Sequence, residues 1–334
     1  MRKGLHLLGC FTLVGAVIIG LTVLQGSAWA QGDSPLMVTD GEHQAHIFPT
    51  VELSHELFRS PSDAGPLLYH SGGVVLTGPV TFYVIFWVPA HLQNGDTTQM
   101  TSHYRTVQTD LLEDYAGHGI DNNNTQYYEN VGGRTTYIQN SGGIGHTYTD
   151  TRAYPTSGCN DPATPGNCMT DAQIRAEIER VIALRDWPTG FGSMFLLYTS
   201  SGEGSCFDST GSNCAYVTYC AYHSFINGSS PIFYSNEPYG GNNSCTNGAP
   251  SPNNDFDADT AASAASHEIS ETITDPELNA WLTEENNEIG DICEYNYGTN
   301  SWDSSKANQK WNGHYYELQM EFDNHQHACV QVGP

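Results

Sequence analysis

The stretch DTAASAASHEISETITDP, residues 259–276, predicts a helix that Pro276 ends, because proline cannot continue the hydrogen-bond pattern of a helix. Alanine and serine dominate its first turns. Their small side chains allow another element of the fold to approach the helix closely. We therefore expect a buried helix at this point in the chain.

Within this helix, His267, Glu268 and Glu271 stand in the order His-Glu-x-x-Glu. Residues four apart share one face of a helix, so His267 and Glu271 can bind one ion. Zinc peptidases carry His-Glu-x-x-His on a helix, and the glutamate of that motif is their general base. Imidazole nitrogen and carboxylate oxygen are both ordinary zinc ligands. The motif predicts Zn²⁺ as cofactor, His267 and Glu271 as ligands and Glu268 as catalytic base. An acidic helix without a metal is the alternative.

A third ligand is expected downstream, in the acidic segment NNEIGDICEY. Asp291 lies 24 positions after His267 and Glu288 lies 21 after it. Zinc enzymes whose third ligand is a downstream carboxylate have comparable separations. We prefer Asp291 as the third ligand and keep Glu288 as the alternative. Without a metal, the two carboxylates would cap a turn around Gly290.

Other candidate ligands are weaker. His325 and His327 alternate on an expected strand and would face the same side, where they could complete a metal site or simply pack. His223 lies beside Cys220 and is expected to be a structural histidine. The aspartates at 255, 257 and 259 resemble the start of a calcium loop, but that loop requires glycine at 260 and glutamate at 266. The chain has threonine and serine there, so we assign the aspartates to the helix N-terminus.

The first thirty residues indicate export. Arg2 and Lys3 precede a long apolar run, and SAWA places Ala28 and Ala30 in the pattern of a signal peptidase site. We expect residues 1–30 to be a cleaved signal peptide, with an uncleaved membrane anchor as the alternative. The protein is then secreted and extracellular, or periplasmic if it is bacterial. No stable membrane association is expected after cleavage.

The exported chain is strongly acidic. The whole sequence has 11 basic and 37 acidic residues and a net charge of −26, and loss of Arg2 and Lys3 makes the exported charge −28. Such a chain repels phosphate backbones, so we expect no nucleic-acid partner.

Eight cysteines remain after residue 30, and an even number in an exported chain predicts disulfides. We expect Cys159 to pair with Cys168 across a turn-rich loop and Cys293 to pair with Cys329. No free thiol is expected.

The remaining pattern predicts a mixed α/β (α+β) fold in a single secreted domain, with a mostly β core, the zincin-like helix and disulfides. Residues 31–65 lack strong periodicity and are expected to be a linker or a short pro-segment, and the domain spans 66–334. Beyond the 259–276 helix, we expect buried strands at 80–88, 193–200 and 230–236, helices within 100–119 and 170–188, a hairpin after residue 121 and closing strands at 314–322 and 327–332.

Several segments resemble the EXORDIUM or phosphate-induced proteins of plants. The resemblance lies in LLYHSGGVVLTGPVTFYVIFW at 67–87, FLLYTS at 195–200, YCAYHSF at 219–225, TDPELNAW at 274–281 and EIGDICEYNYG at 288–298. These segments cover well under half of the exported chain. The resemblance implies an extracellular protein linked to growth and cell-wall expansion, and it implies no settled chemistry. Many plant members lack His-Glu-x-x-Glu on the matching helix, so this chain would represent a metal-binding branch.

Two functions follow from these patterns. The first is a secreted zinc-dependent hydrolase, a metallopeptidase by preference, that acts on a polypeptide or cell-wall substrate with metal-activated water. The alternative is a non-catalytic binding or signalling protein of the EXORDIUM type, associated with the cell wall. Its 19 tyrosines and 6 tryptophans would then stack on carbohydrate or wall polymers.

Overall fold

The computed structural model describes residues 1, 34, 36–57, 65–156, 158–240, 243–246, 248–298 and 304–334. The expected signal peptide lies outside the described residues, apart from Met1. Gly32–Pro334 forms one compact unit. Its described part has a mixed α/β fold, as expected, with five α-helices around a seven-stranded sheet.

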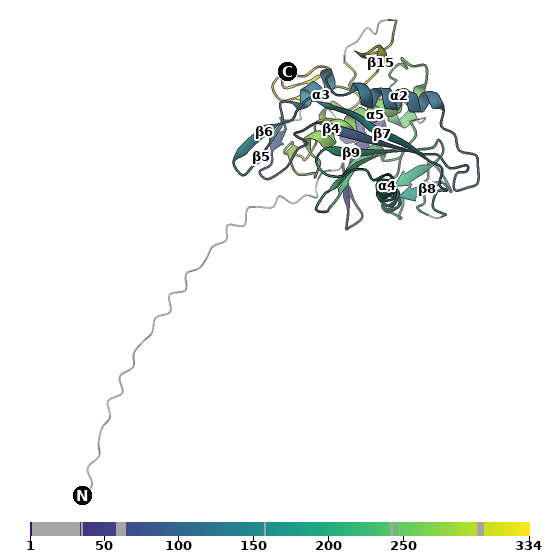
Figure 1. Ribbon diagram of the computed structural model, residues 1–334, viewed down its shortest axis with the longest axis horizontal. Coiled ribbons are helices and arrows are strands. Elements are labelled where there is room, and N and C mark those ends of the chain that lie inside the picture. The colour runs from purple at the N-terminus through teal and green to yellow at the C-terminus, as the bar shows by residue number, and fades with distance from the viewer. Residues whose placement is uncertain are drawn as a thin grey trace. The chain divides into compact units, whose positions relative to one another are not determined.

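The central sheet has the strand order β1-β2-β11-β12-β9-β4-β7. Its parallel half contains β7 (Gly142–Asp150), β4 (Val80–Trp87), β9 (Ser193–Thr199) and β12 (Ile232–Glu237) (Figure 1). Its antiparallel half adds β11 (Tyr219–Ile226), β2 (Gln44–Pro49) and β1 (Met37–Thr39). β4, β9 and β12 confirm three expected strands.

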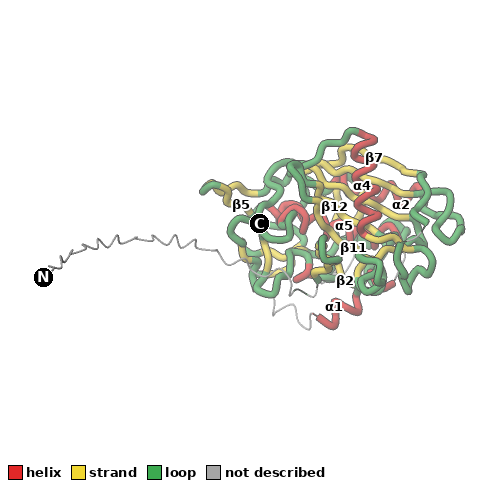
Figure 2. The backbone as a smooth tube through the Cα atoms, turned by 90° about the horizontal axis from the view of Figure 1, so that it is seen from below, coloured by secondary structure: helices red, strands yellow, loops and turns green. Residues whose placement is uncertain are grey.

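Helices cover both faces of the sheet, which explains the nearly continuous apolar sequence of β4. Phe82, Val84 and Phe86 pack in the same core cluster as α2 (Ser102–Asp114) and α5 (Phe256–Thr274). The alternate residues Tyr83 and Ile85 pack in the cluster of α4 (Asp171–Arg185), on the opposite face. Figures 1 and 2 both place α4 across the sheet from α2.

The N-terminal segment corrects one expectation. Residues 31–65 were expected to be a linker or pro-segment, but their described part forms β1, β2 and α1 (Val51–Leu57). β2 pairs antiparallel with β11, and Ala45, Ile47 and Phe48 are buried. The expectation of a linker is therefore wrong for residues 37–57, because this segment completes the sheet. Short strands with mixed polarity have a weak sequence signal.

Helix α5 is buried along almost its whole length, as its alanine-rich start indicated. Asp255 caps it by accepting a hydrogen bond from the backbone N–H of Ala258. The helix packs against α2 and against β11 and β12. The hydroxyls of Tyr115 and Ser270 lie 2.6 Å apart and join the α2 end to the middle of α5. A helix held on several sides gives its side chains fixed positions.

Smaller elements complete the described fold. Thr170 and Gln173 form a capping box at the start of α4, which confirms the helix expected within 170–188. The described residues also form α3 (Gly119–Asn124) and two 3-10 turns, η2 (Asn243–Cys245) and η3 (Asp291–Cys293). Five two-stranded sheets remain: β3 (Leu68–Tyr69) with β13 (Trp281–Leu282), β5 (Tyr128–Val131) with β6 (Arg134–Tyr137), β8 (Cys168–Thr170) with β10 (Gly204–Cys206), β14 (Gln309–Trp311) with β15 (His314–Tyr316), and β16 (Glu321–Asp323) with β17 (Ala328–Val330).

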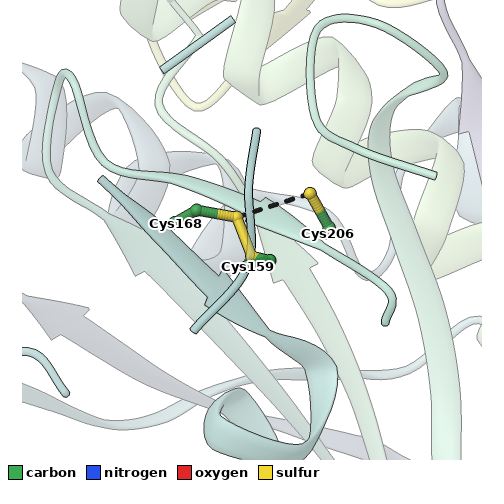
Figure 3. A group of neighbouring side chains, drawn as sticks. All are labelled: Cys159, Cys168 and Cys206. Carbon is green, nitrogen blue, oxygen red and sulfur yellow. Dashed lines mark hydrogen bonds between the residues drawn. A yellow bond between two sulfur atoms is a disulfide. The ribbon is translucent and has the colours of Figure 1, made fainter. Parts of the chain in front are cut away.

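Four disulfides join the eight cysteines that follow residue 30. The expected pairs Cys159–Cys168 and Cys293–Cys329 are confirmed. The other two are Cys206–Cys214 and Cys220–Cys245. Figure 3 shows the first disulfide beside Cys206, whose sulfur lies 3.4 Å from that of Cys168. These four bonds fit an extracellular protein.

Candidate metal centre

Four buried elements bring histidines and carboxylates together beneath the antiparallel half of the sheet. Helix α5 supplies the motif residues, the segment through η3 supplies the downstream carboxylates, and β2 and β11 supply two more histidines. We call this set the His–carboxylate cluster; its members are His46, His223, His267, Glu268, Glu271, Glu288 and Asp291. Each side chain is at most 1% exposed.

The downstream carboxylates lie where the sequence placed them. Asp291 begins η3, and its Oδ2 accepts a hydrogen bond of 2.5 Å from the backbone N–H of Glu288. The disulfide Cys293–Cys329 ties the end of η3 to β17. The local turn and this covalent link hold Glu288 and Asp291 against α5.

The two strand histidines are neighbours in the sheet. His46 on β2 and His223 on β11 are register partners, so both side chains leave the same face of the sheet. Their ring centroids lie 6.2 Å apart. Because α5 packs against this face, both rings meet the motif carboxylates.

Most distances between the strand histidines and the carboxylates of the cluster are longer than hydrogen bonds. His46 Nδ1 lies 3.8 Å from Glu271 Oε2, and His46 Nε2 lies 3.6 Å from Asp291 Oδ2. His223 Nδ1 lies 3.5 Å from the same Glu271 oxygen and 3.2 Å from Glu268 Oε2. A hydrogen bond between nitrogen and oxygen is shorter, about 2.9 Å. Two ligand atoms on one tetrahedral zinc lie roughly 3.3 Å apart, given bonds of about 2.0–2.1 Å.

Many polar atoms of the cluster make no hydrogen bond to another protein atom. They include both ring nitrogens of His46, both side-chain oxygens of Glu271 and Glu288, Nε2 of His223 and Oε1 of Glu268. A buried polar group without a partner costs about 1–3 kcal/mol, and more when it is charged. Bound cations would satisfy these atoms.

Two sets of three side chains have the spacing of metal ligands. One consists of His46, Glu271 and Asp291, and the other of His223, Glu268 and Glu271. Glu271 belongs to both. A third geometric group, Cys159, Cys168 and Cys206, has its sulfurs in disulfides and therefore offers no thiolate (Figure 3).

His267 lies beside two carboxylates of the cluster, with its Nε2 3.9 Å from Asp291 Oδ1. Its Nε2 lies 3.0 Å from Glu271 Oε1, while its Nδ1 lies 2.9 Å from the side-chain nitrogen of Gln319. Its ring also packs on Phe48, with centroids 4.4 Å apart. Neither of the two His–carboxylate sets described above includes His267.

The electrostatics of the cluster are strongly perturbed. Burial and the nearby Glu271 raise the pKa of Glu268 well above its usual value, and the same two causes raise that of Glu288. Burial also raises the pKa of Asp291, to about 7. Burial opposes protonation of His46, but Asp291 and Glu271 outweigh it and raise the pKa to about 9. Several negative groups therefore compete for few positive partners.

Glu271 differs from its neighbours. Burial alone would raise the pKa of its carboxyl, but the surrounding histidines, His267 first, lower it well below its usual value. Burial lowers the pKa of His223. Glu271 is thus the carboxylate of the cluster that most favours the charged form, and it stands at its centre.

Three candidates of the sequence analysis fall outside the cluster or change role. His325 and His327 lie in the turn between β16 and β17 rather than on a strand, and both are exposed. His223, expected to be structural, lies inside the cluster. Asp259 accepts hydrogen bonds from Ser251 and Asn253 near the start of α5, as an assignment to the helix N-terminus suggests.

Sequence reasoning missed His46 altogether. The residue lies in QAHIFP, a histidine within a short apolar stretch, inside the segment that was expected to be a linker. The strand propensity of that stretch was the signal that could have indicated a strand there. Its pairing with β11 depends on residues far along the chain.

Comparison of the chain with family models, with curated proteins and with solved structures found no match. The resemblance to EXORDIUM proteins stays a prediction. Among the described residues, no helix is long and apolar enough to cross a membrane.

Proposed function

We propose that this chain is a secreted zinc-dependent hydrolase that acts on polypeptides. The supporting observation is the convergence of three buried side chains, those of His46, Glu271 and Asp291. Both ring nitrogens of His46, both oxygens of Glu271 and Oδ1 of Asp291 have no hydrogen-bond partner. One imidazole and two carboxylates form a ligand set that zinc accepts. Two carboxylates also balance the charge of one divalent ion. The four disulfides support the extracellular location.

In this proposal His267 is a positioning residue. With the ion bound, its Nε2, which lies 3.0 Å from Glu271 Oε1, would donate a hydrogen bond to that oxygen, while Oε2 is directed at His46 and His223. A ligand held by a second hydrogen bond keeps its orientation and its basicity. The role that the sequence assigned to His267 thus passes to His46.

Zinc supplies Lewis acidity toward a carbonyl group and makes bound water more acidic. Glu268 is the general base, as its place after the histidine of the motif predicts. It follows that its carboxyl must exchange a proton near neutral pH, and the raised pKa of Glu268 suits this task. His223 Nδ1, 3.2 Å from Glu268 Oε2, holds the carboxyl in place.

A second candidate function rests on burial. All seven side chains of the His–carboxylate cluster are at most 1% exposed, so a substrate reaches the ion only if a covering segment moves. A cation that stabilises an extracellular binding protein needs no such movement. In that case the metal would join β2, β11, α5 and η3 without taking part in a reaction.

Two variants and a control test the proposal. Glu268→Gln keeps the size of the side chain but removes the base, so it should keep zinc at His46 and lose all cleavage of a denatured-protein substrate mixture followed by mass spectrometry. His46→Ala should lose both zinc and cleavage. Glu284→Gln changes an exposed residue in the segment that precedes Glu288, and it should alter neither zinc content nor cleavage. Wild-type protein loaded with one equivalent of zinc that cleaves nothing in the mixture would instead support the binding-protein function.

A further inference from the structure

His223 and Glu268, which form a set with Glu271, are not needed to hold the first ion. The three ligand atoms of this set nevertheless lie close together and are fully buried. Nε2 of His223 and Oε1 of Glu268 have no hydrogen-bond partner in the protein. An ordinary structural histidine would have both ring nitrogens satisfied.

Charge gives a second argument. Glu268, Glu271, Glu288 and Asp291 bring four carboxylates into one buried volume, and the ion pairs found for them all have histidine as the partner. One divalent ion balances two of these charges, and two ions balance all four. Unbalanced buried charge is costly. One divalent ion therefore leaves carboxylate charge that a second cation would balance.

Glu271 and Glu288 lie between the two strand histidines. Glu271 Oε2 is 3.8 Å from His46 Nδ1 and 3.5 Å from His223 Nδ1. Glu288 Oε2 is 3.7 Å from His46 Nδ1 and 3.5 Å from His223 Nε2. A carboxylate between two imidazoles can bridge two ions, and bridged ions in two-metal sites stand about 3.5–4 Å apart.

We propose that His223, Glu268 and Glu271 bind a second divalent cation, and that Glu271 bridges it to the ion at His46 and Asp291. This inference rests on the proposed metal centre and adds a site to it. Glu288 lies beside both ions as a further ligand. While the second ion is bound, the Glu268 carboxylate is a ligand and cannot serve as the base, so the second site controls the first.

The test is the number of zinc ions per chain. Full-length exported protein is stripped with chelator, reloaded with Zn²⁺ alone and weighed by native mass spectrometry. The expected result is two ions in wild type and one in His223→Ala and Glu268→Gln, with two retained in the exposed control Glu284→Gln. Glu268→Gln preserves size and hydrogen-bonding capacity, so it tests the site even if His223→Ala does not fold.

The other outcomes separate the two proposals. One ion in wild type overturns the second site and leaves the proposed function standing, whereas no ion overturns both. Two ions that persist in Glu268→Gln place the second ion elsewhere and overturn the assignment. Loading with Co²⁺ tests the bridge: electron paramagnetic resonance should show two magnetically coupled ions, and two uncoupled ions would overturn a bridging Glu271.

Discussion

The side-chain nitrogen of Gln319 lies 2.9 Å from Nδ1 of His267. The same nitrogen donates a hydrogen bond of 3.1 Å to the carbonyl oxygen of Gly290, which can only accept. The contact with Gly290 thus fixes the orientation of the amide, and Nδ1 of His267 must be an acceptor. In the neutral ring the proton is then on Nε2, which faces Glu271. This arrangement places the protonated Nε2 of His267 3.0 Å from an oxygen of Glu271.

The tautomer of His267 is the first prediction. In zinc-loaded protein, nitrogen chemical shifts from long-range proton–nitrogen correlation spectra should show Nε2 protonated and Nδ1 unprotonated. The reason is the Gln319 donor, which excludes a proton on Nδ1. A spectrum with the proton on Nδ1 and a metal-shifted Nε2 would show that His267 binds zinc directly, as the motif alone suggested.

Replacement of His46 is the second prediction. His46→Ala removes a ligand from the strand β2 and should lower the zinc content by one ion per chain, measured by elemental analysis after gel filtration. It should also lower the free energy of unfolding by about 2.7 kcal/mol at a zinc concentration 100 times the dissociation constant, because the ion binds the folded state. His55→Ala, on the exposed side of α1, is the matched control and should bind zinc as wild type does. Equal zinc content in both variants would remove His46 from the site.

The third prediction concerns the effect on zinc affinity of adding a methyl group at Gly290. A Cβ there would lie 2.4 Å from His267 Nδ1 and 2.9 Å from Glu271 Oε1. The backbone at Gly290 has φ −78°, which alanine adopts freely, so Gly290→Ala tests space alone. We expect zinc affinity to fall roughly 10- to 100-fold in a calorimetric titration, the range seen when support of a ligand is lost.

Gly78→Ala is the control for that substitution, because no atom lies within 4 Å of a Cβ at Gly78. Its zinc affinity should equal that of wild type. If Gly290→Ala also binds zinc as wild type does, the close packing of His267 on Glu271 is irrelevant to the metal.

The pH dependence of the metal-free protein is the fourth prediction. Burial raises the pKa of Asp121 to about 7 and those of Glu203 and Glu237 to about 8. Between the usual carboxyl pKa and these values the folded state holds more protons than the unfolded state, so stability falls as pH rises from about 4 to 8. Thermal unfolding in chelator should therefore occur at a higher temperature at pH 5 than at pH 8.

Zinc should change this pattern, because its ligands bind in their deprotonated forms. The stabilisation by added zinc should be larger at pH 8 than at pH 5 in the same melting experiment. Greater stability of the chelated protein at pH 8 than at pH 5 would mean that these buried carboxyls are not protonated as expected.

Local features of the fold were predictable from the sequence. The capping box of Thr170 and Gln173 and the end of α5 before Pro276 depend on residues a few positions apart. The apolar run of β4 indicated a strand buried on both faces. The disulfides Cys159–Cys168 and Cys293–Cys329 followed from turn-rich sequence and position.

The candidate site was predictable only in part, because its members come from distant segments. The i, i+4 spacing of His267 and Glu271 is local, and it correctly brought both into one buried cluster. His46 and His223 meet there through the register of β2 on β11, which no short motif encodes. The orientation of His267 depends on Gln319, a single residue in the last part of the chain. Such long-range pairings are set by tertiary packing.

Anomalous diffraction at the zinc absorption edge tests the central claim most directly. Crystals of zinc-loaded exported protein should show a strong peak between His46, Glu271 and Asp291, with ligand distances of about 2.0–2.2 Å. His267 should lie beyond bonding distance of that peak, with Nε2 directed at Glu271. An ordered His–carboxylate cluster with no anomalous peak after zinc loading would contradict the metal centre, and these carboxyls would then be protonated groups of the protein interior.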